Sequence, residues 1–304
     1  MTVTMPLPDA ADVAAAAARI APHVRRTPLL DAQVDGRRIL LKLEYLQRSG
    51  SFKLRGAVNA ILAGPQDLHI VTASGGNHGL GVATAASLLG VGATVYVPET
   101  VPEGKARRIE AAGARLVRFG ASYAEAAAAA EEAAARPGHR YLPAYDDAAV
   151  IAGQGTLAAE IVADEPAVDA IAVAVGGGGL AAGTVLAAGS RTTVAVEPHG
   201  CRALAAALEA GRPVDTEIDS VASSALGATR IGVLPYALLS TDSVRSVLVS
   251  DDEIRAARDL LWEHFRVAVE PAAATPFAAW LAGRVPGALP CLVLCGANTD
   301  WTPA

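Results

Sequence analysis

The chain has 304 residues, enough for one large or two moderate domains and for a core that needs no disulfide or metal to hold it. Its formal net charge is −6, with 25 basic against 31 acidic side chains and no basic run, which disfavours nucleic acid as a partner. Hydrophobic residues make up 52% of the chain and aromatic residues only 4%, a composition typical of tightly packed helices and strands and not of disorder.

Short apolar runs alternate with Ala-rich segments, the βαβα pattern that predicts an open parallel sheet covered by helices. Residues 124–135 are predicted to form a solvent-facing helix that ends at Arg-Pro-Gly. The segment 66–147 holds three strand–helix alternations, which predicts a small domain inserted in a larger one (1–65 and 148–304), with the site in the cleft between them. The expected strands cover residues 39–43, 69–72, 94–97, 115–119, 170–175, 193–196, 246–249 and 291–295.

Two uncharged stretches, 79–98 and 170–190, are as long as a membrane span. Each contains several glycines, which would weaken a lipid-facing helix, so we expect no membrane insertion. The N-terminus lacks the ordered regions of a secretory signal peptide. The three cysteines, Cys201, Cys291 and Cys295, are unevenly spaced, and we expect them to be reduced thiols in a cytoplasmic protein.

Three glycine-rich turns each follow a predicted strand and open a predicted helix, at residues 74–79, 176–179 and 295–298. Free backbone N–H groups and the positive end of a helix coincide at such turns, which favours anion binding. In an open α/β sheet the carboxyl ends of the strands share one edge, so the turns are predicted to converge on one crevice. Glycine at any one turn could instead only permit close packing of helix on strand.

The second turn has an alternative interpretation. Gly176, Gly178 and Ala181 fit the pattern G-x-G-x-x-A, and Glu197 follows about 20 residues later, where a nicotinamide enzyme holds a ribose. An NAD-dependent oxidoreductase is therefore a distant alternative.

Lys53 lies just inside a predicted helix, after Ser51 and Phe52, with few acidic residues nearby beyond Glu44. The positive end of a helix and burial both lower the pKa of a lysine and free its amine for nucleophilic or Schiff-base chemistry. A lysine more often lies on a solvated surface.

Taken together and in this order, the motifs resemble those of fold type II pyridoxal-phosphate (PLP) enzymes, in the serine/threonine dehydratase group that also includes serine racemase. The resemblance covers nearly the whole chain and implies a tryptophan synthase β-like α/β fold, with two open, mostly parallel twisted sheets covered by helices. The matching stretches are Glu44–Ala57 (ENLQxTGSFKxRGA), Ser74–His78 (SxGNH), Ala144–Thr156 (AYDDAAVIAGQGT), Gly176–Gly179 (GGGG), Val269–Ala274 (VEPAAA) and CGANTD near the end.

The resemblance also implies a role for each matching residue. Lys53 would form a Schiff base with PLP and later take the substrate's α-proton. Phe52 would pack against the pyridine ring, Asn77 would bond the phenolic oxygen, and Cys295 would meet the pyridine nitrogen. The remaining roles fall to backbone-rich loops: Gly176, Gly177, Gly178 and Gly179 for the phosphate, and Ser74, Gly75, Gly76, Asn77 and His78 for the substrate carboxylate.

A neutral thiol is a poor partner for a pyridinium, so the Cys295 contact predicts a moderate electron sink and fast loss of the β-hydroxyl, with the cofactor phosphate as its proton donor. The implied activity is α,β-elimination of L-threonine or L-serine to a 2-oxo acid and ammonia. Serine racemase and 3-hydroxyaspartate dehydratase of the same fold are alternatives. Gly75 stands where the racemases have a serine, so we expect negligible racemisation.

Other positions depart from the family pattern. Glu197 matches a metal-site glutamate, but Ala203 replaces its aspartate, so no complete metal site is predicted and Glu197 is only a possible ligand. Residues 219–228 replace the usual IADG stretch, and their serines could line the side-chain pocket or cap a helix. Tyr45 and Ala297 replace Asn and Gly, which leaves the preferred β-hydroxy amino acid open.

Two further expectations concern Glu270 and the end of the chain. Glu270 could orient groups near the cofactor or cap the helix that follows Pro271. The chain stops at Ala304, which leaves no room for the regulatory domain of some threonine dehydratases, so we expect no feedback inhibition by isoleucine. The resemblance suggests a homodimer that binds a small amino acid.

Overall fold

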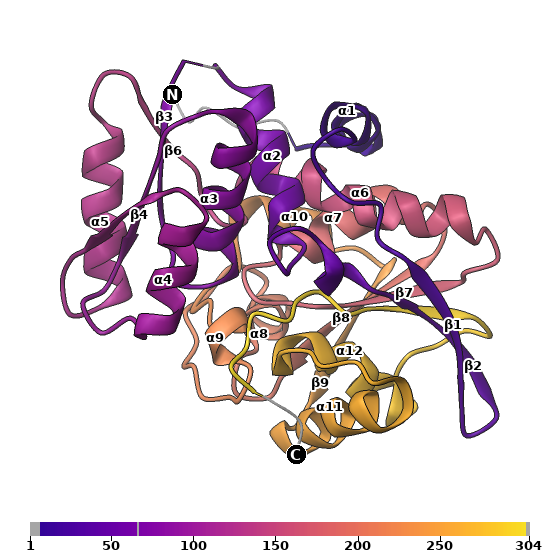
Figure 1. The fold of residues 1–304 in the computed structure, drawn as a ribbon. Helices are drawn as coiled ribbons and strands as arrows, with labels where there is room; N and C mark the ends of the chain where they lie inside the picture. The colour runs from indigo at the N-terminus through magenta and orange to yellow at the C-terminus, as the bar shows by residue number, and fades with distance from the viewer. Residues whose placement is uncertain (1–6, 66, 302–304) are drawn as a thin grey trace.

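The computed structural model describes residues 7–65 and 67–301, and their strands form two sheets (Figure 1). The larger sheet has six strands in the order β1-β2-β10-β7-β8-β9. Only the β1–β2 pairing is antiparallel, and the other neighbours are parallel. The strands are β1 (Leu29–Val34), β2 (Arg37–Lys42), β7 (Ala170–Ala174), β8 (Thr192–Pro198), β9 (Val244–Val249) and β10 (Pro290–Val293).

Helices cover both faces of the larger sheet. On one face α7 (Gly179–Ala188) contacts β7 and β8, with α6 (Ala148–Asp164) behind it and α1 (Ala10–Ile20) behind α6. On the other face α12 (Pro271–Leu281) contacts β7 to β10, and α11 (Asp251–Phe265) packs on α12. Every residue of β7 is buried, as expected of a parallel strand covered on both sides. The shorter helices are η1 (Glu44–Leu46), α8 (Ala203–Ala210), α9 (Ser223–Leu226) and α10 (Val233–Leu239).

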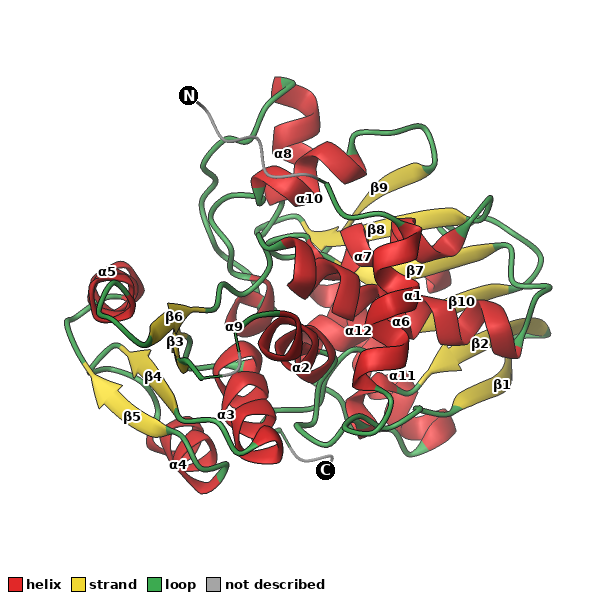
Figure 2. Ribbon diagram, turned by 90° about the horizontal axis from the view of Figure 1, so that it is seen from above, coloured by secondary structure: helices red, strands yellow, loops and turns green. Residues whose placement is uncertain are grey.

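The smaller sheet is parallel, with the order β5-β4-β3-β6. Helix α5 (Tyr123–Ala134) lies on one face, and α3 (Asn77–Leu89) and α4 (Glu103–Ala111) lie on the other (Figure 2). The strands, β3 (His69–Ala73), β4 (Ala93–Val97), β5 (Arg115–Arg118) and β6 (His139–Tyr141), all lie inside the predicted small domain. Residue 66, its predicted start, is outside the described residues, and the domain boundaries stay a prediction.

Helix α2 (Lys53–Ala63) lies between the two sheets, where it contacts α3 on one side and α6 on the other. Its residues from Leu54 to Ile61 are all buried. Apolar residues of α2 belong to the same core cluster as Ile70 and Val95 of the smaller sheet. A Cβ at Gly153 of α6 would lie 2.7 Å from the Arg55 carbonyl oxygen, so glycine allows the two helices to approach closely.

The predicted fold class is confirmed: the protein has two mostly parallel sheets with covering helices. Each of the eight predicted strands has a counterpart, and α5 confirms the helix predicted at 124–135. Strands β1 and β6 were not predicted. The uncharged stretches 79–98 and 170–190 are each divided between a helix and a strand.

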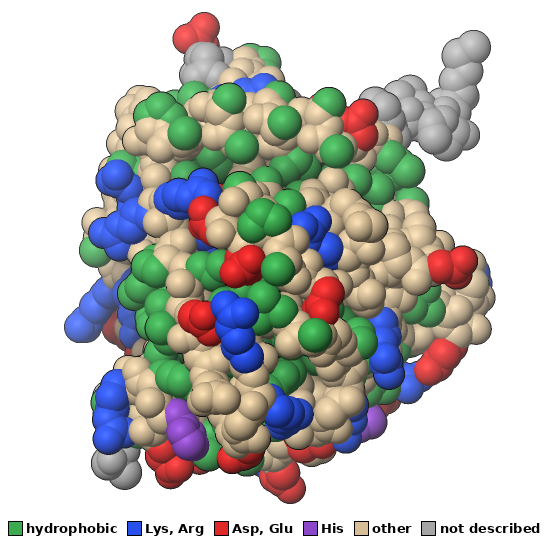
Figure 3. Space-filling view, turned by 90° about the vertical axis from the view of Figure 1, so that its right-hand side faces the viewer, with side chains coloured by type: hydrophobic (Ala, Val, Ile, Leu, Met, Phe, Trp, Pro, Cys, Tyr) green, Lys and Arg blue, Asp and Glu red, His purple; other side chains and the backbone are tan. Residues whose placement is uncertain are grey.

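On the face shown in Figure 3, basic and acidic side chains lie interspersed over the middle, and several basic side chains follow one another along the left edge. Among the described residues, no helix is both long and apolar enough to cross a bilayer.

Candidate active site

A cavity of about 440 Å³ opens at the ends of strands from both sheets. It lies within the size range of small-molecule sites. Nearly all of the predicted site residues line it, and all three glycine-rich turns contribute; these lining residues are Phe52, Lys53, Ser74, Gly75, Gly76, Asn77, His78, Gly176, Gly177, Gly178, Gly179 and Cys295. Glu197, the possible metal ligand, is the exception. The structure therefore brings together segments up to 243 residues apart, from Phe52 to Cys295.

Lys53 is the first residue of α2, and its amine reaches into this cavity. The Nζ atom donates a hydrogen bond to the Ala144 carbonyl oxygen at 2.7 Å and lies 5.2 Å from the centroid of the Phe52 ring. Burial lowers the pKa of Lys53 to about 8, and the nearby Cys295 opposes this only in part. A sizeable fraction of the amine is thus uncharged near neutral pH, as nucleophilic chemistry requires.

Asn77, the first residue of α3, belongs to a chain of three hydrogen-bonded side chains. Its Nδ2 donates to Glu270 Oε1 at 2.7 Å, and its Oδ1 accepts from Asn298 Nδ2 at 2.7 Å. Glu270 occupies the N-cap of α12, but its side chain makes no capping hydrogen bond. Of the two roles that the sequence left open for Glu270, the contact with Asn77 supports the orienting one.

The loop before α3 supplies further polar groups. The Ser74 hydroxyl accepts a hydrogen bond from the Gly76 backbone N–H at 3.2 Å, which closes the loop on itself. His78 is buried, and its Nε2 lies 3.0 Å from the Leu142 carbonyl oxygen. Burial and the charge of Lys53 lower the pKa of His78 to about 3, so the ring is neutral. Since a carbonyl only accepts, the Nε2 atom carries the proton.

The four-glycine turn leads into α7, and its last glycine, Gly179, is the first residue of that helix. Gly178 has φ 93°, in the left-handed region that favours glycine. A Cβ at Gly178 would lie 2.6 Å from Ile231 Cδ1, and a Cβ at Gly177 would overlap the ring of Tyr145. Glycine is therefore required by the packing of neighbouring side chains, in addition to the access for an anion that the sequence suggested.

Cys295 follows β10 and lines the cavity beside the Lys53 segment. The Phe52 backbone N–H donates to the Cys295 carbonyl oxygen at 3.0 Å, which holds the two segments together. Burial raises the pKa of the Cys295 thiol, so the group is a neutral thiol at physiological pH.

Glu197 does not line this cavity. Its two carboxylate oxygens accept hydrogen bonds from the backbone N–H groups of Leu204 and Ala205 at 2.7 and 2.9 Å, and so cap α8. Burial raises its pKa to about 7. Glu197 is fully buried against α8 and does not line the cavity, so the cavity lacks the acidic ribose partner that the NAD alternative required. Within residues 7–65 and 67–301, no group of three or more His, Cys, Asp or Glu side chains is placed to hold a metal.

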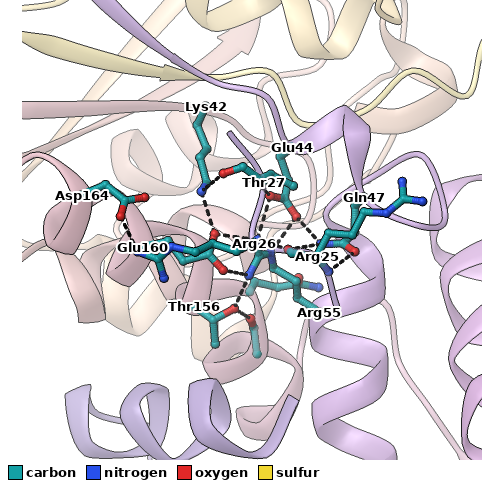
Figure 4. Close-up of polar contacts among 12 residues, drawn as sticks. Arg25, Arg26, Thr27, Lys42, Glu44, Gln47, Arg55, Thr156, Glu160 and Asp164 are labelled. Atoms are coloured by element: carbon teal, nitrogen blue, oxygen red, sulfur yellow. Dashed lines mark hydrogen bonds and ion pairs between the residues drawn. The ribbon is translucent and has the colours of Figure 1, made fainter. Parts of the chain in front are cut away.

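Buried and partly buried charged side chains form a network of ion pairs around Arg55, on the helix that begins at Lys53 (Figure 4). This network was not predicted from the sequence. Arg55 is fully buried; its Nε contacts Glu44 Oε1 at 2.6 Å and its Nη1 contacts Glu160 Oε1 at 2.7 Å. Lys42 Nζ contacts Glu160 Oε2 at 2.6 Å. The contacts of Arg55 hold α2 against η1 and α6. Arg55 is two residues after Lys53 in the same helix. The sequence signal is that Glu44 and Arg55 both match specified letters of the ENLQxTGSFKxRGA pattern, while Glu160 lies outside it.

Comparison with known proteins agrees with this geometry. Residues 20–296 match the family described as pyridoxal-phosphate dependent enzyme. The biosynthetic L-threonine dehydratase of Mycobacterium tuberculosis is 38% identical over 311 residues, which cover 95% of this chain and 72% of that protein. The L-threonine ammonia-lyase of Geobacter sulfurreducens is 36% identical over 298 residues, covering 93% and 73%.

Solved structures show the same relationship. The T.th. threonine deaminase superposes with a TM-score of 0.91 at 35% identity, covering 97% of this chain and 100% of that one. Maize serine racemase superposes with a TM-score of 0.89 at 30% identity, covering 97% and 95%. From the family match, the sequence identities and the shared fold, we conclude that this chain belongs to the fold type II pyridoxal-phosphate-dependent enzymes.

Proposed function

We propose that this protein is a PLP-dependent ammonia-lyase that converts L-threonine, L-serine or a similar β-hydroxy amino acid into a 2-oxo acid and ammonia. The observation that carries this proposal is the Lys53 amine, whose pKa is lowered to about 8, in one cavity with Asn77 and the turn at Gly176–Gly179. The names of the relatives, threonine dehydratase and threonine ammonia-lyase, support the same reaction.

The lining of the cavity fits the cofactor. Lys53 offers an amine for the aldehyde, the glycine turn before α7 offers a helix N-terminus for the phosphate, and Cys295 offers a thiol for the ring nitrogen. Phe52 and Asn77 complete the set at the ring and its phenolic oxygen. When bound, PLP supplies the electron sink that stabilises negative charge at the substrate Cα.

The protein's own side chains then position the substrate and move its protons. The turn from Ser74 to His78 opens α3, so its backbone N–H groups suit a substrate carboxylate. The uncharged Lys53 Nζ accepts the α-proton of the substrate. Loss of this proton and of the β-hydroxyl as water leaves an enamine, and hydrolysis of the enamine takes up one water and releases ammonia.

Two residues favour elimination over competing reactions. The neutral Cys295 thiol leaves the cofactor a moderate electron sink, which limits the lifetime of a carbanion and with it transamination. Gly75 has no side chain to return a proton on the face opposite Lys53, which argues against racemisation. A Cβ at Gly75 would lie 2.7 Å from Val101 Cγ2, so a serine there would require Val101 to move.

The test is to incubate the purified, PLP-loaded protein with L-threonine, L-serine and 3-hydroxyaspartate and to measure ammonia, 2-oxo acid and D-serine. We expect 2-oxo acid and ammonia in equal amounts, little D-serine, and loss of both the yellow colour and the activity in Lys53→Ala. The absence of ammonia and 2-oxo acid with every substrate would refute the lyase assignment. D-serine formed as fast as ammonia would favour the racemase alternative.

We further propose a cytoplasmic homodimer in which residues 66–147 form a small domain beside a larger one built from 1–65 and 148–304. The four strands of the smaller sheet between residues 69 and 141 support this division. Light scattering of the purified protein tests the dimer, and a monomeric mass would refute it.

A further inference from the structure

Glu270 is a buried carboxylate that faces the active-site cavity without capping its own helix. Its side chain lines the cavity, and the residue is only 4% exposed. A charged group in such a place needs partners. The side chain that meets it is that of Asn77, at 2.7 Å.

The polarity of the hydrogen bonds determines how the Asn77 amide is turned. Asn298 Nδ2 donates to the Ser49 carbonyl oxygen at 3.0 Å and to Asn77 Oδ1 at 2.7 Å. A carbonyl only accepts, so the Asn298 amide group has its nitrogen on this side, and Asn77 must present its oxygen to it. The Asn77 nitrogen then faces Glu270, and an ionised carboxylate can only accept from it.

This arrangement uses one of the two protons on Asn77 Nδ2. Asn77 itself lines the cavity, so the second proton is the donor that it can offer to a bound molecule. A protonated Glu270 could donate as well as accept, so only the ionised carboxylate reinforces the Asn77 orientation that the Asn298 contact sets.

We propose that Glu270 is a positioning residue, whose carboxylate orients the Asn77 amide so that its remaining N–H faces the phenolic oxygen of PLP. This inference rests on the proposed function, because it concerns the cofactor that the lyase would use. A donor at that oxygen favours its anionic form.

The charges around Glu270 bear on whether it is ionised. Burial raises the pKa of Glu270 to about 7, whereas the Asn77 hydrogen bond and the positive charge of Lys105 act in the opposite direction. Lys105 and Arg108 of α4 line a small crevice together with Glu270 and Asn298, and the Cys295 thiol is close enough to interact electrostatically with Glu270. Among the ion pairs and side-chain hydrogen bonds of the described residues, none involves the Lys105 ammonium, and its positive charge favours the Glu270 carboxylate.

The experiment compares PLP-loaded wild type with Glu270→Gln, which keeps the size of the side chain but lets it donate as well as accept. We expect the dissociation constant for PLP to rise about tenfold, the effect of one charge-assisted hydrogen bond. We also expect the visible absorbance band of the bound cofactor to titrate at a higher pH. Glu197→Gln is the matched control, since Glu197 is a buried carboxylate away from the cavity, and it should change neither quantity.

The double variant Asn77→Ala/Glu270→Gln separates positioning from general stability. If Glu270 acts through Asn77, adding Glu270→Gln to Asn77→Ala changes PLP affinity by less than about twofold. Should Glu270→Gln fail to fold by circular dichroism, Asn298→Ala serves instead, since it removes the other contact that orients Asn77 and should shift the same band.

The outcomes distinguish the two proposals. A wild-type protein that binds no PLP and stays colourless refutes the proposed function. A coloured wild type whose absorbance and PLP affinity are unchanged in Glu270→Gln, or whose double variant shows additive losses, refutes the positioning role alone.

Discussion

The lowered pKa of Lys53 predicts how the rate of cofactor capture depends on pH. Only the uncharged amine attacks an aldehyde, and burial lowers the pKa from its ordinary value of 10.5 to about 8. At pH 7 about 9% of such an amine is uncharged, against about 0.03% of an ordinary lysine, a difference of roughly 300-fold. We expect capture to speed up about tenfold per pH unit below 8 and to level off above it.

The assay uses the cofactor-free protein, mixed with PLP at pH values from 6 to 10, quenched with borohydride and mapped by mass spectrometry. The sequence contains only three lysines, Lys42, Lys53 and Lys105, so the labelled sites are easily resolved. Lys42 is fully buried in its ion pair with Glu160 and should stay unlabelled. N-acetyl-lysine in the same solutions corrects for the ionisation of PLP itself.

One result would refute the reasoning directly. If the corrected rate at Lys53 kept rising through pH 10 in parallel with that of N-acetyl-lysine, burial would not lower the pKa of this amine. The proposed assignment of Lys53 as the cofactor-binding nucleophile would then lose its physical basis.

Three further predictions concern packing and charge. Gly177→Ala places a methyl group into the ring of Tyr145 and should destabilise the protein by about 1–3 kcal/mol, with weaker PLP retention. Gly104→Ala is the control, because its added methyl group meets no atom within 4 Å. It should leave the melting temperature nearly unchanged or higher. Arg55→Met leaves the buried Glu44 carboxylate without its cation, while Glu160 keeps Lys42, and should lower the free energy of unfolding by about 3–5 kcal/mol in a urea titration; a loss below about 1 kcal/mol would contradict this role. The pKa of Glu197 rises on folding from 4.5 to about 7, so the folded state holds its proton more tightly and the free energy of unfolding should fall as pH rises between these values; Glu197→Gln should make this fall shallower, and an unchanged slope would count against the shift.

The secondary structure could be predicted largely from local patterns, and the two missed strands show the limits. The turn between β1 and β2 is Asp35-Gly36, with φ 50° and 75°, a dipeptide typical of tight hairpins, so the sequence does contain a local signal for β1. β6 has only three residues, and it exists because it pairs with β3, about 70 residues earlier. Such a strand has no signal of its own in the sequence.

The candidate site shows a similar division. The glycine turns and Lys53 could be placed from sequence, because a turn between a strand and a helix brings its residues to a sheet edge wherever the chain folds that way. The contact of Asn77 with Glu270 spans 193 residues, and that of Arg55 with Glu160 spans 105. These pairs arise from the packing of distant segments, which no local pattern describes.

The position of α2 has a consequence for exchanging parts between related enzymes. Its apolar residues complete the core of the smaller sheet, while Arg55 anchors the same helix to η1 and α6. The helix that carries the amine is therefore shared by both halves of the molecule. A chimera that replaced residues 69–141 with the matching piece of a relative would disturb Lys53 unless the contact surface for α2 were transplanted with it.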